Sequence, residues 1–484
     1  MKGRPARTLN ATPIYPKLPR VAVAPALVPR IALTLAVVAG AVPVSDADLR
    51  AATDGLLAEI AKVRRLSPKV APATLERRLE TPAASRARRA AELAAAAVDP
   101  ELAARVRLWA QLGLVPAGAG PDKVVGSSLD AAATASYDPL ARRLFVPDWI
   151  PLADQRPALA HALAHALDDQ RFGLRDFLGI DLEGRHHLDG DVERARLALV
   201  EGDAALTALE LDDARGALTG AHALPALANG IAEAPAPRGA PAWARVLSSF
   251  AHADGLAFVA RVRGRQPWSG VDALWKDPPR SSEQILHPER YDAREAPVVL
   301  ARPKARALEG FREAASDVLG ELGVRTWLAL VGTPDVIAER AAAGWGGDRA
   351  TLFETGGADG GGSFPAPDAG APPSSDGGAP TGRRTFALWS TVWDDPTDAE
   401  DFARAAGPAL ARLAGVAHAD DEDPHRLVAR GAAGTFALAW RGAAVALLFG
   451  APDGVVPALD ELVTPEPARK SRPRGNAPRP PRAP

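Results

Sequence analysis

Pro-Ala-Leu-Ala-His-Ala-Leu-Ala-His-Ala-Leu-Asp-Asp-Gln, residues 157–170, is the stretch around which this chain is organised. Its alanines and leucines favour a helix, in which His161 and His165 lie on one face, one turn apart. Two imidazoles at this spacing can bind one zinc ion. Histidines four residues apart also occur by chance in helices, as hydrogen-bonded core residues. The spacing alone therefore leaves both interpretations open.

Glu201 is the best candidate for a third metal ligand. It lies on the next predicted helix, 192–211, and it is followed by Gly202, which allows a close helix approach. The alternative is a solvated carboxylate. Two histidines and one glutamate leave the fourth zinc position to water, which is the arrangement of a catalytic rather than a structural site.

The usual catalytic base of such a site is absent from this motif. In the H-E-x-x-H motif of metallopeptidases, the Glu after the first His is the general base, and here that residue is Ala162. We expect residue 162 to face the substrate cleft of such a site. The positions that share its ridge on the helix hold no acid: Ala158, Leu159, His165 and Ala166. The motif therefore offers zinc ligands without the base.

Further motifs accompany the histidine pair: Tyr137-Asp138-Pro139, residues 161–167 with Asp169-Gln170, Glu201-Gly202-Asp203-Ala204, residues 278–291 and residues 344–349. Together they resemble a family of secreted bacterial and archaeal zinc peptidases of the gluzincin type, over about residues 50–450. The run 278–291 is long and specific, so the match does not depend on the histidines. The resemblance implies an α+β, mainly helical fold, with a zincin-like metallopeptidase core that contains the active-site helix and a C-terminal α+β part.

The resemblance also implies roles for single residues. Zinc would be bound by His161, His165 and Glu201. Asp203 would lie beside them and orient a ligand imidazole through a hydrogen bond.

His287 and Tyr291 would reach the cleft and donate hydrogen bonds to the oxyanion of a tetrahedral intermediate. Anchoring of a loop is the alternative role for both residues. The chain departs from the family at Ala162 and at Asp168, which stands where Gln is usual. These departures put catalysis in doubt and leave metal binding formally intact.

Composition limits the classes of partner and of ligand. Of the 484 residues, 47% are hydrophobic and 24% are charged, which is ordinary for a globular protein large enough to bury a core. A net charge of −2 gives no broad field that would attract nucleic acid or a membrane surface. There is no cysteine, so any metal must be held by histidines and carboxylates.

The order of segments predicts an exported protein. Residues 1–30 are basic and the uncharged run 31–44 follows, which is typical of a signal peptide cleaved near Ala41; a short buried or interfacial helix is the alternative. The predicted segments are a signal peptide at 1–41, a helical segment at 45–115, a zincin-like domain at 120–345, a C-terminal α+β segment at 346–463 with a disordered insert at 356–382, and a basic, Pro-rich disordered tail at 464–484. No stable membrane span is expected after cleavage.

Local signals predict single elements. Asp99 before Pro100 predicts a helix start, and Gly113 predicts its end. Regular helices are expected at 243–263 and 305–322.

Three functions follow from this reading. The first is an exported metallopeptidase-like protein, periplasmic, cell-surface or extracellular, that has lost catalysis, has kept or lost its zinc, and binds a peptide or protein ligand. The second is an active zinc peptidase with a non-standard base. The third is a structural envelope protein. The sequence leaves the oligomeric state open.

Overall fold

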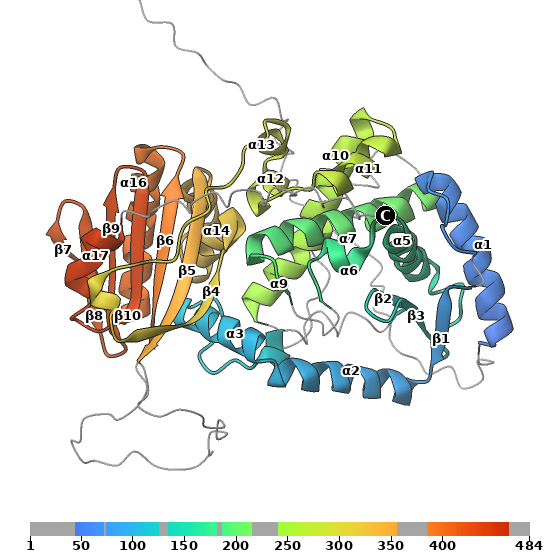
Figure 1. The fold of residues 1–484 in the computed structure, drawn as a ribbon, viewed down its shortest axis with the longest axis horizontal. Helices are drawn as coiled ribbons and strands as arrows, with labels where there is room; N and C mark the ends of the chain where they lie inside the picture. The colour runs from blue at the N-terminus through green and yellow to red at the C-terminus, as the bar shows by residue number, and fades with distance from the viewer. Residues whose placement is uncertain are drawn as a thin grey trace, which may run out of the picture. The chain divides into compact units, whose positions relative to one another are not determined.

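The computed structural model describes residues 44–71, 74–124, 134–181, 186–214, 241–355 and 385–463 (Figure 1). The predicted signal peptide, insert and tail lie outside these ranges. The described residues all belong to one compact unit. Helices and strands are mixed in it, so the α+β class is confirmed. Within the described ranges, every helix is too short or too polar to span a bilayer.

The first part of the chain is mainly helical. Its elements are α1 (Asp46–Arg64), β1 (Glu76–Glu80), α2 (Pro82–Val98), α3 (Pro100–Leu112), β2 (Ser136–Asp138), β3 (Arg143–Pro147), α5 (Arg156–Phe172), α6 (Leu174–Phe177), α7 (Gly190–Asp213), α9 (Ala242–Ser249), the π-helical turn η2 (Phe250–Asp254), α10 (Gly255–Arg265), α11 (Trp268–Lys276), α12 (Ser282–Leu286) and α13 (Pro288–Asp292). The three strands form a small sheet in the order β1-β3-β2, with β1 parallel to β3.

The predicted ends of α3 are confirmed. Asp99 accepts hydrogen bonds from the backbone N–H groups of Glu101 and Leu102, and Pro100 occupies the first turn. Gly113 closes the helix at a φ of 84°, a conformation that glycine adopts without strain. Local capping chemistry is therefore sufficient to define this helix.

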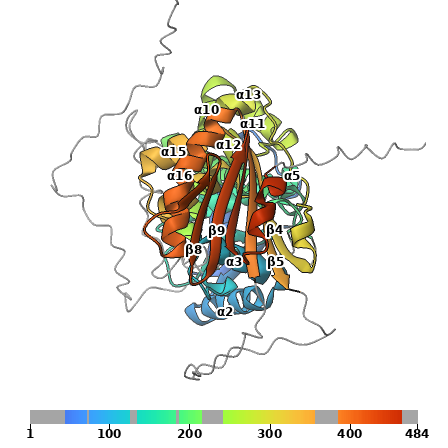
Figure 2. The same ribbon diagram turned by 90° about the vertical axis from the view of Figure 1, so that its left-hand side faces the viewer.

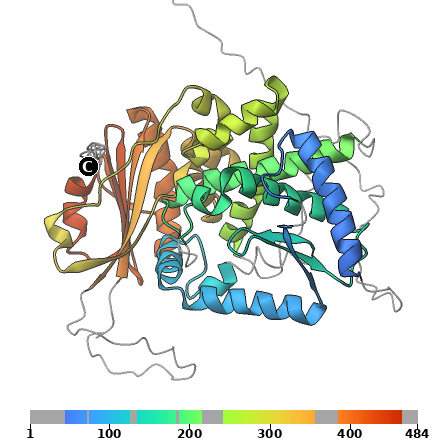
Figure 3. The ribbon, with the colours of Figure 1, turned by 45° about the vertical axis from the view of Figure 1, so that its right-hand side comes forward.

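The helix α5 packs against α1, α7 and the small sheet (Figure 1, Figure 3). One hydrophobic cluster joins these elements, and its members include Leu49, Leu56, Ile60, Leu144, Leu163, Leu167 and Leu211. Burying one such side chain stabilises the fold by roughly 1.5–3 kcal/mol, so the cluster fixes α5 firmly against its neighbours.

The second part of the chain is built on a seven-stranded antiparallel sheet in the order β4-β5-β6-β10-β9-β8-β7 (Figure 2). Its elements are η3 (Arg306–Leu308), β4 (Phe311–Asp317), α14 (Gly320–Leu330), α15 (Asp335–Ala342), β5 (Trp345–Thr355), β6 (Thr385–Trp393), α16 (Pro396–Ala414), β7 (Asp420–Asp423), β8 (Arg426–Gly431), β9 (Gly434–Arg441), β10 (Ala444–Ala451), η4 (Val456–Ala458) and α17 (Leu459–Leu462).

Both faces of this sheet are buried. Along β6, Ala387 and Trp389 join the core shared with α3, α14 and α16, whereas Phe386 and Leu388 join the opposite core, which includes Leu459 of α17. This alternation follows from the two-residue period of a strand.

One expectation fails in this part. The helix predicted at 305–322 is wrong, because residues 311–317 form β4, which pairs antiparallel with β5, and α14 begins only at Gly320. Pairing with a long strand overrides the helical composition of a short Ala- and Glu-containing segment. The predicted boundary at 345/346 stays a prediction; β4, α14 and α15 lie before it in the chain and pack with the elements that follow it. The helix α3 packs here too, and its Trp109 donates to Asp317 at 3.0 Å.

Candidate metal centre

The helix α5 presents two histidines side by side. It carries Pro157 in its first turn and ends at Gly173, whose φ is 76°. His161 and His165 project from one face, and their Nε2 atoms lie 2.9 Å apart. The side chains are 28% and 13% exposed, so this face of α5 is accessible from solvent.

Glu201 of α7 completes a cluster of three donors. Its Oε2 atom lies 3.1 Å from the Nε2 atom of His161 and 3.4 Å from that of His165. One ligand atom from each residue lies within 4.8 Å of the other two. The structure therefore brings together the three residues that the sequence analysis proposed as ligands.

The donor set suits a divalent transition metal ion. Two imidazole nitrogens and a carboxylate oxygen are the ligands that zinc takes in open sites. In the neutral rings each imidazole carries one proton, and only one hydrogen fits between the facing Nε2 atoms. One metal cation can accept the lone pairs of both Nε2 atoms and of the Glu201 carboxylate at once. Hydrogen bonds among these three groups alone satisfy them poorly.

The charges at the site are strongly coupled. Burial alone would raise the pKa of Glu201, but His165, His161 and His252 together outweigh burial and hold the pKa of this carboxylate well below its ordinary value. Burial and the neighbouring His165 lower the pKa of His161. Glu201 is thus an anion at neutral pH, next to a histidine that favours its neutral, metal-binding form.

His252 also reaches this site, and the sequence analysis did not identify it. Its Nε2 atom lies 3.4 Å from the Oε2 atom of Glu201, and its ring stacks on that of His161 with 6.4 Å between centroids. His252 belongs to the π-helical turn η2, within a run for which the hydrophobic period predicted one regular helix. π-helical turns are rare overall, but they often occur at functional sites. Their sequences carry no periodic signal that would reveal them.

A pair of glycines brings this π-helical turn close to α7. A Cβ atom on Gly202 would lie 2.2 Å from the carbonyl oxygen of Gly255, and a Cβ atom on Gly255 would lie 2.1 Å from that of Ala198. No larger residue fits at either position without a backbone shift. The glycine after Glu201 thus allows the close approach that its position suggested, and this approach carries His252 toward Glu201.

Asp203 does not take the expected place beside the imidazoles. It is fully buried, and its two oxygens accept a bidentate pair of hydrogen bonds from Arg64 of α1, both at 2.8 Å. The indole N–H of Trp275 donates to it as well, at 2.8 Å. Asp203 therefore ties α7 to α1 and α11, and its acceptor oxygens are used there rather than on the imidazole of His161 or His165.

Asp168, the second departure from the family, belongs to the same buried cluster. Burial first, and then Asp203, raise its pKa well above the ordinary value, although Arg64 opposes them. One of its oxygens has no hydrogen-bond partner among the described residues. We therefore assign Asp168 a structural role in this buried cluster.

His287 and Tyr291 are also engaged away from the three donors. The Nε2 atom of His287 lies 2.8 Å from Glu321 of α14, and the hydroxyl of Tyr291 donates to the carbonyl of Asp277 at 2.7 Å. These contacts hold the segment 277–291 in place. They support the loop-anchoring alternative and not the expected contact with an oxyanion.

The expectation that residue 162 faces a cleft is wrong. Ala162 is 2% exposed and packs in the cluster that joins α5 to α1. The helix turns residue 162 by about 100° from His161, toward the interior. A glutamate at this position would therefore enter the core, so more than one residue separates this site from a peptidase site.

A second group of acidic side chains is paired with an arginine. Ligand atoms of Glu283, Glu295 and Asp394 lie within 4.8 Å of one another. The guanidinium of Arg290 lies 2.7 Å from both oxygens of Glu295 and 2.9 Å from Asp394. The arginine supplies the positive charge that this group needs.

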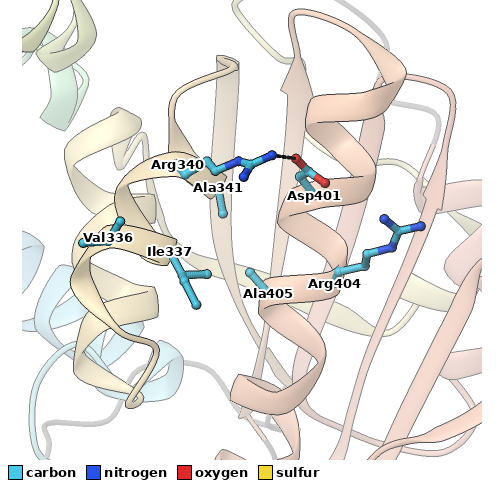
Figure 4. A pocket seen from close by; sticks show the side chains of 7 residues that line it. All are labelled: Val336, Ile337, Arg340, Ala341, Asp401, Arg404 and Ala405. Carbon is cyan, nitrogen blue, oxygen red and sulfur yellow. Dashed lines mark ion pairs between the residues drawn. The ribbon is translucent and has the colours of Figure 1, made fainter.

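A surface hollow of about 440 Å³ lies between α15 and α16 (Figure 4). Its lining consists of Val336, Ile337, Arg340, Ala341, Asp401, Arg404 and Ala405. Arg340 and Asp401 lie 3.9 Å apart across it. The hollow shares no residue with the three-donor cluster, and it has no arrangement of an acid, base and nucleophile.

Comparison with known proteins concerns the second part of the chain. Residues 306–460 match a family described as a domain of unknown function (DUF8575). No curated protein and no solved structure matches the chain. The matched region contains the sheet and none of the four residues His161, His165, Glu201 and His252.

Proposed function

We propose that this protein is an exported, metallopeptidase-like protein with a zincin-like core, which binds zinc through His161, His165 and Glu201 and binds a peptide or protein ligand without efficient hydrolysis. The observation that carries the proposal is the convergence of these three donors from two helices, with nitrogen and oxygen atoms 2.9–3.4 Å apart. Bound zinc would supply Lewis acidity at this site.

The lack of a base favours binding over turnover. Position 162 is a buried alanine, and the ridge of α5 that contains it holds no acid. Positioned acid–base groups contribute roughly 10² to 10⁴ in rate, so a site without one loses most of its turnover while its ligand contacts remain. The partial exposure of the two histidines places the site at the protein surface, where a peptide or protein ligand can reach it.

Metal analysis of the purified protein tests the first half of this proposal. We expect about one zinc ion per wild-type chain and a loss of most of it in His165→Ala, because the change removes one of the two imidazoles that α5 places side by side for the ion. His418→Ala is the matched control, since that side chain is 82% exposed and lies outside the cluster. A metal-free wild type after purification without chelators would overturn the proposal and favour a structural envelope protein.

An active peptidase is the second candidate, and His252 is the observation that favours it. This half-exposed imidazole lies beside Glu201 and comes from a distant segment, as a substitute base would. A fluorescently labelled unfolded protein distinguishes the two candidates, because binding and cleavage are measured in one assay. We expect binding with negligible cleavage; rapid cleavage that a chelator abolishes would favour the active enzyme.

Export is part of the same proposal and rests on the basic and then apolar order of residues 1–44. N-terminal sequencing of the protein recovered from cell fractions tests it. We expect a new N-terminus near residue 41 or 42. An intact Met1 in the cytosolic fraction would contradict export.

A further inference from the structure

The carboxylate oxygen of Glu201 is shared by three imidazoles and not two. His161, His165 and His252 place their Nε2 atoms 3.1, 3.4 and 3.4 Å from its Oε2 atom. The first two histidines come from α5, and the third comes from the π-helical turn η2. The packing of Gly202 on Gly255 holds that turn against α7.

The ring of His252 is held as metal-binding histidines are held. Its Nδ1 atom lies 2.9 Å from the carbonyl oxygen of Ser248, which can only accept, so Nδ1 carries the hydrogen. A histidine that binds a metal almost always donates its other N–H group in this way. By contrast, the buried Nδ1 atom of His165 has no hydrogen-bond partner among the described residues.

This hydrogen bond determines which ring nitrogen of His252 faces Glu201 and whether that nitrogen carries a hydrogen. In the neutral ring, the Nε2 atom bears a lone pair, and at 3.4 Å it faces the carboxylate oxygen, which is also an acceptor. Two acceptors repel each other unless a proton on Nε2 or a metal ion lies between them. A metal ion shared by Glu201 and His252 removes that repulsion.

We infer that His252 is a fourth protein ligand that closes the metal shell formed by His161, His165 and Glu201; this inference rests on the proposed function. The Nε2 atom of His252 is not among the donors that all lie within 4.8 Å of one another. Binding therefore requires its ring to turn toward the pair on α5. The side chain is 39% exposed, so solvent and not packed protein occupies much of its surroundings.

A shell of three histidines and one glutamate has consequences for function. Zinc prefers four ligands, and structural sites supply all four from the protein, whereas catalytic sites leave one to water. With His252 bound, no position remains for a water nucleophile. These four side chains would then hold α5, α7 and the π-helical turn together around the ion, as in a structural or metal-carrying centre.

Cobalt replaces zinc as a visible probe of this shell. The full-length protein is stripped of metal and loaded with Co²⁺, and its absorption spectrum is recorded while azide, a small anionic ligand, is added. If His252 fills the shell, azide leaves the wild-type spectrum unchanged. In His252→Ala the vacated position binds azide, and its spectrum shifts. The affinity for Co²⁺ should fall by more than the roughly 10–100-fold that is typical of losing a group outside the shell.

Two further samples keep the result interpretable. His252→Gln retains much of the side-chain volume but is a poor ligand, and it should behave as His252→Ala does; thermal unfolding checks that both variants fold. His418→Ala should match the wild type. Azide shifts of equal size in the wild type and in His252→Ala would overturn the fourth ligand and leave the three-ligand site standing. A wild type that binds no Co²⁺ would overturn the proposed metal site and the fourth ligand together.

Discussion

The C-terminal sheet and the three-donor cluster on α5 and α7 each contain a carboxylate, and they satisfy it in different ways. Asp348 of β5 is 1% exposed. It accepts four hydrogen bonds of 2.9–3.1 Å, from the backbone N–H groups of Leu319 and Gly320 and the indole N–H groups of Trp345 and Trp389. Glu201 shares one oxygen among three imidazoles, whose nitrogens can also bind metal. The hydrogen bonds within the protein satisfy the carboxylate of Asp348, whereas the imidazole nitrogens around Glu201 are groups that can bind a metal ion.

This difference separates two motifs that look equally important in the sequence. The run 344–349 contains Asp348, and its carboxylate joins β5 and β6 to the first turn of α14. The donors to Asp348 are backbone and indole N–H groups, which can only donate hydrogen bonds and cannot bind a metal ion. We therefore assign this motif to stability and the donors on α5 and α7 to binding.

The largest expected effect comes from removing the carboxylate of the sheet. Asp348→Ala leaves four buried donors without an acceptor and should lower the free energy of unfolding by roughly 4 kcal/mol, because each unsatisfied buried group costs about 1–3 kcal/mol and water relieves some of them. Urea unfolding measures this loss. Asp335→Ala, at an exposed position on α15, is the control. A loss no larger than that of the control would remove the distinction between the two regions.

The next effect tests the interior face of α5. Ala162→Glu places a charged side chain in the cluster that joins α5 to α1, and we expect a loss of roughly 3 kcal/mol from overpacking and buried charge. Ala58→Glu, on the exposed face of α1, should change little. Unfolding temperatures of the two variants measure the contrast. A stable Ala162→Glu protein with chelator-sensitive peptidase activity would show instead that residue 162 reaches the metal.

Glu283 is a third buried carboxyl group, and its surroundings differ from those of Asp348 and of Glu201. Burial first, and then Glu321, raise its pKa to about 8, and one of its oxygens has no hydrogen-bond partner among the described residues. The folded state then binds more protons than the unfolded state between pH 4.5 and about 8. Stability is therefore highest below pH 4.5 as far as this group is concerned, and it falls as the pH rises, by at most about 1.4 kcal/mol per pH unit.

Glu283→Gln tests this sign, because the amide is neutral at every pH. We expect the unfolding temperature of the wild type to fall from pH 5 to pH 8, and part of that fall to be absent in the variant. Glu289→Gln is the control, since the side chain of Glu289 is 61% exposed. Parallel curves for the wild type and Glu283→Gln would mean that Glu283 is ionised in the folded protein.

The smallest expected effect is that of a site residue in the absence of metal. With a chelator present, His161→Ala should unfold within about 1 kcal/mol of the wild type, because the side chain is partly exposed. Zinc at 100 times its dissociation constant should then stabilise the wild type by about 2.7 kcal/mol and the variant much less. Calorimetry with and without zinc measures both values. A large loss under chelator would assign this histidine to stability, like Asp348.

The amino-acid sequence by itself determined the local features of this protein. The apolar composition of α5 sets its helical period and so puts His161 and His165 one turn apart, and Asp99 and Gly113 define the ends of α3. These features depend on residues within a few positions of one another, where capping and periodicity act directly.

Only the tertiary structure decided which groups meet. The contact of Gly202 with Gly255 brings His252 to Glu201 across 51 positions of sequence, and Arg64 takes the carboxylate of Asp203 from 139 positions away. The pairing of β4 with β5 likewise overrode a helical composition. Each outcome depends on which surfaces pack against each other. That choice is set by the whole core and leaves no periodic signal in the segments concerned.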